Sequence, residues 1–332
     1  MTTFAGRVIV NQVVETMGEF STRQEALMYR WSPGSKLLSR GTLFLICALC
    51  ATSAVAQEKP QKIPNEFFVL NEDGTGWKSL YRFPGGNANG SVSVSPDGKA
   101  IAFDSWPGEK MRESSIYIKE LEGGEPRKLC SGMMPTWSKE GRFLTCSRYE
   151  PVRGVWLIEI DGEEREHLCP GWGAQWSPDG RKIAFSEGAA VSVFDIVKDE
   201  FQTILEAGQS PYRRVFFNMT WSPDSEQICL KGVKRDGTEE IATLRSVGGK
   251  PVLKVHHSVN VEVHPDFAWH PKGDRIVCAI FCPERGVTQL YDFNPEKDDP
   301  PQLVKGQDET RNNTDTTWTH DGKTLIVVSG DF

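Results

Sequence analysis

The sequence predicts an all-β fold: a six-bladed β-propeller with four antiparallel strands in each blade. Three observations support this prediction. A short phrase recurs six times along the chain, each copy places turn residues between two apolar runs, and a second hairpin pattern follows the phrase. Repeats of roughly 40–50 residues with strand patterning are typical of propeller blades.

The recurring phrase is clearest at Trp176-Ser177-Pro178-Asp179-Gly180-Arg181, before the apolar run of residues 183–185. In such a turn, proline presets φ, aspartate bonds to its own backbone and glycine adopts positive φ, so the phrase joins two antiparallel strands. The large ring at the first position is expected to fill the space between adjacent blades. The first positions of the six copies are Val94, Trp137, Trp176, Trp221, Trp269 and Trp318.

A second hairpin completes each repeat. After the first copy, Ile116-Tyr117-Ile118 precedes a Gly123-Gly124 turn and the run of residues 127–129. The second copy repeats this arrangement around Asp161-Gly162. Each repeat therefore supplies four strands, which is one blade.

The two ends of the repeat region complement each other. The last repeat stops at Phe332, after its second strand, whereas residues 67–81 form a hairpin around Asp73-Gly74 with no preceding half. A closed ring leaves no unpaired edge between the first and last blades. The N-terminal hairpin is therefore expected to complete the last blade.

The segment ahead of the repeats is typical of a secretory signal peptide. Basic residues up to Arg40 precede an apolar run over 42–55, and Ala54-Val55-Ala56 provides a small-x-small cleavage pattern. A single membrane anchor is the alternative interpretation. We expect an upstream extension at 1–27, a signal peptide at 28–56, a linker at 57–64 and the propeller at 65–332.

Composition excludes several classes of protein. The 332 residues include 38 Lys+Arg and 45 Asp+Glu, for a net charge of −7, which argues against a nucleic-acid binder. No long apolar segment follows the N-terminal region, so the chain is not a membrane-embedded protein of several spans. The sequence contains no Gly-x-Ser-x-Gly elbow and no Walker loop.

The cysteine and histidine patterns argue against a structural zinc site and against thioredoxin-like redox chemistry. After the predicted cleavage site no Cys-x-x-Cys pair occurs, and Cys146, Cys229 and Cys278 fall in apolar runs where small buried residues are expected. His270 and His320 occupy turn positions of the repeat and are expected at the surface. No cofactor is predicted apart from a divalent cation in the central channel.

The phrase Trp-Ser-Pro-Asp-Gly, followed by a basic residue, an apolar run and a Gly-Gly hairpin, resembles the TolB-type β-propeller repeat. The resemblance covers residues 65–332. It implies a periplasmic or secreted propeller with a binding role and without enzymatic activity. TolB carries an additional α/β domain ahead of its propeller, and residues 57–66 leave no room for one.

Polar residues three to five positions before the first position of the phrase form the candidate ligand site. Inner strands of a propeller surround its central channel, so these residues are expected near one channel mouth. Carboxylates, amides and one imidazole suit a divalent cation or a polar ligand, and a solvated polar mouth is the alternative. The candidates are Asn89, Asn218, His264, Asp266, Asn313 and Asp315.

Aromatic and basic residues enter the same mouth. Trp172 and Phe216-Phe217 have the chemistry to stack on a sugar or peptide, with packing between blades as the alternative. Arg213-Arg214 forms a local basic loop in an acidic chain, either for an acidic partner or as a solvated loop.

The sequence leaves three hypotheses for function. The first is an exported, monomeric, non-catalytic module that binds a protein or peptide partner, a polar small ligand or a glycan. The second is a propeller-based glycan lyase or hydrolase with a metal or carboxylate site at the channel mouth. The third is a purely structural exported protein. The fold by itself does not choose among them.

Overall fold

The computed structural model describes residues 65–330, apart from 85–87, 162–164 and 248. The predicted extension at 1–27, signal peptide at 28–56 and linker at 57–64 lie outside the described residues, as does the cleavage position at Ala56. Within the described residues, no helix has the length and apolar character needed to span a membrane.

The first three blades each have a four-stranded antiparallel sheet. Their strands, in chain order, are β3 (Ala88–Val94), β4 (Ala100–Trp106), β5 (Ser115–Glu120), β6 (Arg127–Ser131), β7 (Met133–Trp137), β8 (Phe143–Arg148), β9 (Gly154–Glu159), β10 (Arg165–Cys169), β11 (Trp172–Trp176), β12 (Lys182–Glu187), β13 (Ala190–Asp195) and β14 (Glu200–Leu205). A short 3-10 helix, η2 (Met111–Glu113), lies between β4 and β5.

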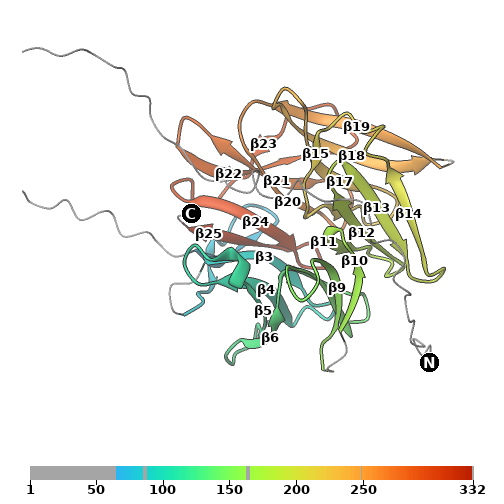
Figure 1. Cartoon of the computed structure of the whole chain (residues 1–332). Helices are drawn as coiled ribbons and strands as arrows, with labels where there is room; N and C mark the ends of the chain where they lie inside the picture. The colour runs from blue at the N-terminus through green and yellow to red at the C-terminus, as the bar shows by residue number, and fades with distance from the viewer. Residues whose placement is uncertain (1–64, 85–87, 162–164, 248, 331–332) are drawn as a thin grey trace, which may run out of the picture. The chain divides into compact units, whose positions relative to one another are not determined.

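The last three blades are labelled with the others in Figure 1. Their strands are β15 (Arg214–Val215), β16 (Thr220–Trp221), β17 (Ile228–Val233), β18 (Glu239–Val247), β19 (Lys250–Val259), β20 (Val263–Trp269), β21 (Ile276–Cys282), β22 (Val287–Phe293), β23 (Gln302–Leu303), β24 (Asn312–Trp318) and β25 (Thr324–Gly330), together with β1 (Glu66–Asn71) and β2 (Lys78–Tyr81) from the N-terminal side. The described chain is thus a six-bladed propeller, as the sequence predicts.

Blade four departs from the regular pattern. Its inner strand is divided into β15 and β16, which both pair with β17. The turn of this blade has Ser225 where other copies have glycine, and Ser225 adopts a φ of 62°. Its hydroxyl also accepts a hydrogen bond of 3.0 Å from the Asp179 backbone N–H, which links the turns of blades three and four.

The recurring phrase forms one turn geometry. In the first copy, the Ser95 hydroxyl donates to Asp97 Oδ1 at 2.7 Å and accepts from the Ala100 N–H at 2.9 Å. The Lys99 N–H donates to the same Asp97 oxygen, and Gly98 adopts a φ of 72°. The serine and aspartate side chains therefore accept hydrogen bonds from backbone N–H groups of the turn, and glycine provides the positive φ that the turn requires.

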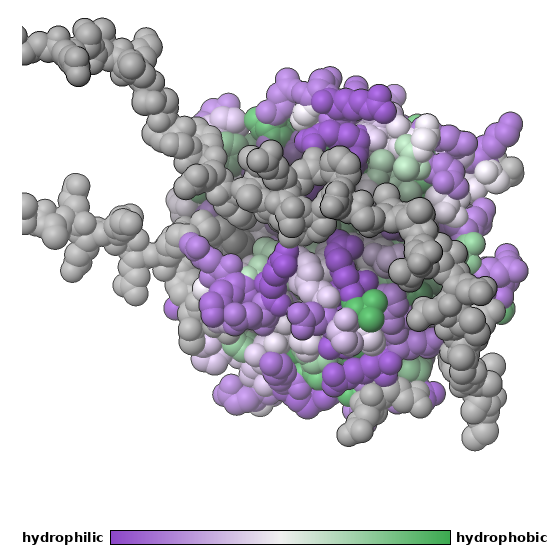
Figure 2. Space-filling model, in the orientation of Figure 1, coloured by the Kyte–Doolittle hydropathy of each residue, from purple (hydrophilic) through white to green (hydrophobic). Residues whose placement is uncertain are grey.

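Hydrophobic packing joins each blade to the next. Each of six buried clusters combines side chains from two adjacent blades, as Ala102 of blade one with Leu144 of blade two. One of these clusters places Phe67 and Val328 of blade six against Phe103 of blade one. The core is therefore a closed ring of interfaces between blades. Hydrophobic residues on the face drawn in Figure 2 are scattered among hydrophilic ones.

The N-terminal hairpin completes blade six. Strand order in this sheet is β2-β1-β25-β24, and β1 runs antiparallel to β25 from Glu66 opposite Ser329 to Asn71 opposite Thr324. The predicted closure is confirmed by this pairing.

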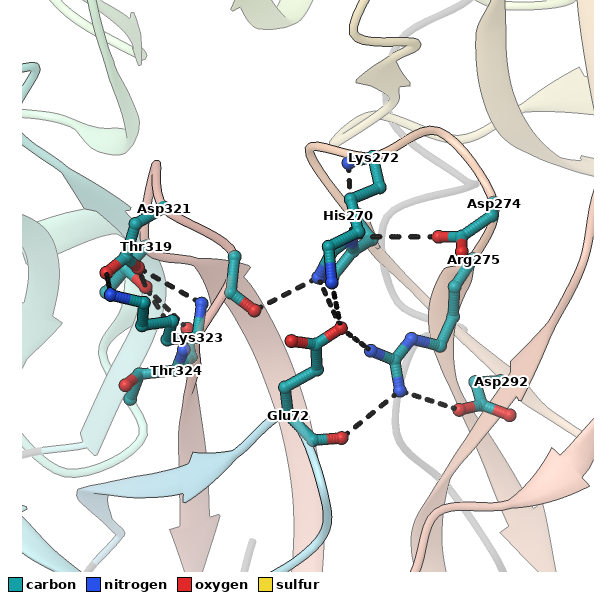
Figure 3. Close-up of polar contacts among 11 residues, drawn as sticks. Glu72, His270, Lys272, Asp274, Arg275, Asp292, Thr319, Asp321, Lys323 and Thr324 are labelled. Atoms are coloured by element: carbon teal, nitrogen blue, oxygen red, sulfur yellow. Dashed lines mark hydrogen bonds and ion pairs between the residues drawn. The ribbon is translucent and has the colours of Figure 1, made fainter.

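Polar contacts of Glu72 reinforce the closure (Figure 3). Glu72 follows β1, and its Oε1 lies 2.7 Å from Lys272 Nζ, 3.4 Å from the Arg275 guanidinium and 3.5 Å from His270 Nε2. Arg275 also lies 3.7 Å from Asp292. The N-terminal hairpin is thereby tied to the turn of blade five as well as to β25.

The surface position predicted for His270 is wrong, because its side chain is 0% exposed. Its Nδ1 accepts from the Lys272 N–H at 3.1 Å, so the proton on Nε2 is directed to the Gly322 carbonyl at 3.0 Å. A histidine at the serine position of the phrase thus bridges the turns of blades five and six. His320 is exposed, as predicted.

The expectation that the tryptophans fill the gaps between blades holds only in part. Trp221, Trp269 and Trp318 are 7–8% exposed, whereas Trp137 and Trp176 are half-buried and line the central channel. The six described cysteines are buried and form no disulfide with one another, and burial agrees with the role expected for Cys146, Cys229 and Cys278.

The closure makes a prediction about stability. Phe67→Ala removes a fully buried ring from the interface between blades six and one, and such a change costs about 3–5 kcal/mol of unfolding free energy. Phe201→Ala, at a ring 53% exposed on an outer strand, is the control and should cost much less. Urea denaturation followed by tryptophan fluorescence measures both. Equal midpoints for the two variants would contradict the closure.

Candidate functional site

The central channel contains a cavity of about 600 Å³. Residues from all six blades line it, and the turn end carries a ring of tryptophans. Ser91, Asn218 and Asp266 line it further along their inner strands. The tryptophans are Trp137, Trp176, Trp221, Trp269 and Trp318.

Irregularities in the inner strands direct particular side chains across the channel. The register shifts in β3, β7, β11, β20 and β24 a few residues before the phrase, and in blade four the strand is interrupted between β15 and β16. Met134, Gly173 and Asn218, each three residues before the phrase, have φ of 57–64°. Bulges of this kind re-aim side chains beside functional sites.

Four blades meet in the resulting polar cluster. The Asn218 side-chain amide donates to Ser91 Oγ at 2.9 Å and lies 2.8 Å from Asp266 Oδ1. Ser91 Oγ lies 3.5 Å from Asp315 Oδ1. His264 stands between two carboxylates, with Nδ1 3.2 Å from Asp266 Oδ2 and Nε2 3.9 Å from Asp315 Oδ2. We call Ser91, Asn218, His264, Asp266 and Asp315 the channel cluster.

A third carboxylate lies beside the channel cluster. Asp104 of β4 is 2% exposed and accepts a hydrogen bond of 2.6 Å from the Met134 N–H of the next blade. Burial raises its pKa well above the ordinary value, the Met134 bond opposes that rise, and the charges of Asp315 and Asp266 add to it. The three carboxyl groups therefore repel one another within a buried space.

The titration of the cluster reflects this repulsion. Burial, together with the charge of Asp266, raises the pKa of Asp315 to about 7, although His264 opposes the rise. Burial lowers the pKa of His264, but the charge of Asp315 and the contact with Asp266 outweigh burial and leave this pKa raised. Protons thus partly neutralise the cluster near neutral pH.

One buried oxygen of the channel cluster, Asn218 Oδ1, lacks a hydrogen-bond partner within the described residues. His264 Nδ1 and Asp266 Oδ2 lie 3.2 Å from each other. Asn218 and Asp266 are 5% and 9% exposed. Because buried polar atoms are normally paired, Asn218 Oδ1 is the feature that calls for a bound group.

The structure brings together four of the six predicted site residues: Asn218, His264, Asp266 and Asp315. It places Asn89 and Asn313 elsewhere. Asn89 exchanges hydrogen bonds with Asn65 at the start of β1, and the Asn313 amide donates to Gln307 Oε1 and to the Asp308 carbonyl. Both are five residues before the phrase, and these hydrogen bonds hold their side chains away from the channel cluster.

Sequence reasoning did not find Ser91 or Asp104. Ser91 stands three residues before Val94, the offset that Asn218, Asp266 and Asp315 share, so this offset alone was a usable signal. Asp104 lies on a second strand, and no feature of the sequence marks it as a neighbour of the channel.

The aromatic residues predicted at the mouth have two different environments. Trp172 is 7% exposed and packs with Met133, Met134 and the partly buried Tyr149 and Phe217. That is packing between neighbouring blades, the alternative that the sequence left open. Phe216 is half-buried, and its ring contacts the cationic groups of Arg214 and Lys231.

Known proteins resemble this chain in structure rather than in sequence. No protein-family model and no curated protein matches it. A protein described as TolB from Agrobacterium tumefaciens superimposes with a TM-score of 0.62 at 16% identity, over 81% of this chain and 99% of that one. The fold is that of the TolB-like propellers. TolB from Acinetobacter baumannii gives a TM-score of 0.54 at 14% identity, over 80% of this chain and 63% of that one.

The same fold also occurs in an enzyme. Hydrazine synthase from Kuenenia stuttgartiensis matches with a TM-score of 0.52 at 16% identity, over 71% of this chain and 72% of that one. At such identities the likeness to TolB and to hydrazine synthase defines the fold alone, so function has to be argued from the channel.

The raised pKa values predict the direction of a pH effect. For both Asp315 and His264, the folded state binds protons more tightly than the unfolded state. Their contribution to stability is therefore largest in mild acid and is lost as pH rises through about 7. With a chelator present, the free energy of unfolding of the wild-type protein should fall between pH 5 and pH 8. In Asp315→Asn this fall should be smaller by about 1–3 kcal/mol.

Urea denaturation at the two pH values, with EDTA present, measures this effect. Asp298→Asn, at a side chain 95% exposed, is the control and should keep the wild-type pH dependence. An unchanged pH dependence in Asp315→Asn would show that Asp315 ionises normally.

Proposed function

We propose that this chain is an exported, non-catalytic binding module whose channel cluster holds a divalent cation. The observation that carries the proposal is the convergence of ligand atoms from His264, Asp266 and Asp315 within 4.8 Å of one another. Among the described residues, no lysine or arginine forms an ion pair with Asp104, Asp266 or Asp315. A bound cation would add positive charge at a place where His264 is the cationic group that faces Asp266 and Asp315.

The donor set indicates which cations to test. Two carboxylates and the unpartnered Asn218 Oδ1 are hard oxygen ligands, and His264 adds one nitrogen. Oxygen ligands favour Ca²⁺ and Mn²⁺, whereas an imidazole favours Zn²⁺ and related ions. Mn²⁺ accepts both donor types and is the cation that this mixture suits best.

The cation would have a structural role. It would hold the inner strands of blades four, five and six together at a point where carboxylates otherwise repel. The tryptophan-lined cavity of about 600 Å³ on the turn side remains as space for a protein or peptide partner, a polar small ligand or a glycan. The TolB-like fold supports a binding role of this kind.

A glycan lyase or hydrolase is the competing function. The pKa of Asp315, raised to about 7, is in the range of a general acid, and this observation favours catalysis. However, Asp266 and Asp315 are only 9% and 5% exposed, which suits an enclosed ion better than a polysaccharide. Burial of the carboxylates therefore favours the cation.

Cation binding is expected to raise the melting temperature. At a free concentration of one hundred times Kd, a cation adds about 2.7 kcal/mol to the free energy of unfolding. In a domain of this size that corresponds to roughly 5–10 °C. Differential scanning fluorimetry of chelator-treated protein with added Mn²⁺, Zn²⁺ or Ca²⁺ at pH 8 measures the shift.

The double variant Asp266→Asn with Asp315→Asn keeps the shape of the site and removes its charge. It should melt at the same temperature with and without each cation. Asn89→Ala with Asn313→Ala, outside the channel cluster, is the control that should keep the shift. If the wild-type protein gave no shift with any of the three cations, the proposal of a cation site would be abandoned.

Export makes a separate prediction. Mass spectrometry of the protein from its native host should find Gln57 at the N-terminus, because cleavage is expected after Ala56. A mature protein that retains residues 28–56 would contradict cleavage.

A further inference from the structure

Three arginines gather at the mouth opposite the turns without any carboxylate partner. Arg214 is the first residue of β15 and Arg213 precedes it, and Arg153 lies just before β9 of blade two. None of the three forms an ion pair with a described residue, and all are exposed. Burial lowers the pKa of Arg214, and the positive charges of Arg213 and Arg153 lower it further. We call these three residues the arginine rim.

Aromatic rings hold two members of the arginine rim in position. Arg153 Cζ lies 4.6 Å from the centre of the Trp172 ring, and Arg214 Cζ lies 4.3 Å from that of Phe216. Lys231 Nζ lies 4.3 Å from the same Phe216 ring. Stacking on an aromatic face orders a guanidinium and leaves its N–H edge available for a carboxylate.

Two carboxylates at the start of β18 already have lysine partners. Glu239 lies 2.8 Å from Lys231 Nζ, and Glu240 lies 3.2 Å from Lys234 Nζ. The Arg213 guanidinium donates only to the backbone carbonyl of Lys234, at 3.2 Å. The arginine rim is therefore a local excess of positive charge on a chain whose net charge is −7.

We propose that the arginine rim docks an acidic peptide segment of a protein partner. Two features favour a peptide over a polyanion such as a sulfated glycan. The chain as a whole carries a net charge of −7, so a long polyanion would meet net repulsion beyond the arginine rim. An apolar cluster adjoins the patch and includes the half-buried Tyr149 and Phe217, which suits a peptide with carboxylates beside apolar side chains.

The arginine rim belongs to the binding role proposed above but does not depend on the cation. Arg214 and Lys231 both contact the Phe216 ring. Lys231 Nζ in turn donates to the carbonyl of Val263, the residue before His264 in the channel cluster. Among the described residues, the three guanidinium groups form no hydrogen bond or ion pair with Asp266 or Asp315. The peptide and the cation are thus separable in an experiment.

A random dodecapeptide phage library tests the proposal without a known partner. Panning against the purified protein should enrich peptides with two or more Asp or Glu beside an aromatic or aliphatic residue. The triple variant Arg153→Gln, Arg213→Gln, Arg214→Gln should not enrich them. A control variant that removes three exposed positive charges elsewhere, at Lys99, Arg181 and Lys297, should behave as wild type.

Fluorescence anisotropy of the most enriched peptide gives the magnitude. The triple rim variant should bind about tenfold or more weakly, as should the peptide with Asp and Glu replaced by Asn and Gln, and binding should weaken at high salt. The triple rim variant should keep the cation-dependent melting shift, so failure of docking and failure of the cation site are distinguishable.

Three outcomes would overturn the proposal. One is panning that gives no acidic enrichment, and another is equal binding by the rim and control variants. The third is competition in which a sulfated oligosaccharide binds the arginine rim more tightly than the enriched peptides, which would identify a glycan site.

Discussion

Closure of the ring is the constraint on which the rest of the molecule depends. The antiparallel pairing of β1 with β25 joins segments at opposite ends of the described chain, and the cluster around Phe67 and Phe103 fills the gap between blades six and one. Without this pairing, the edge of β25 would be open and one of the six interfaces would lose its buried side chains. The inner strands converge on one channel only because the ring is closed.

Convergence brings the chemistry of the channel together. Side chains from four blades meet because each inner strand is bulged or interrupted just before the recurring phrase. The cost is electrostatic: two carboxylates of the channel cluster and Asp104 share a buried space, and protons or a cation have to offset their repulsion. Asp104 also holds the next blade through the Met134 N–H, so charge and architecture are coupled at this point.

The two ends of the channel differ in character. The turn end presents tryptophan and proline around a cavity, whereas the other mouth carries arginines stacked on aromatic rings. A negative interior beneath a positive rim separates the binding of cations from the binding of acidic groups. The cation and the acidic peptide that we propose would therefore bind at different places in the propeller.

The sequence by itself determined the blades. The turn chemistry of Ser-Pro-Asp-Gly is local, and Ser95 and Asp97 satisfy their turn wherever the blade stands, so the repeat and its unmatched hairpin could be recognised without a structure. Local rules also identified Asp266 and Asp315, because both stand at the same offset from the phrase.

Only the tertiary structure decided which polar residues share the channel. Asn89 and Asn313 stand at the same offset as His264, yet they form hydrogen bonds with Asn65 and with Gln307 instead. The place of Asp104, the burial of His270 and the arginine rim all depend on contacts between blades. These contacts join residues that are far apart in the sequence, so no repeated pattern predicts them. A bulge redirects a side chain through a local change of the backbone, and the phrase, which recurs in every blade, does not reveal where that change falls.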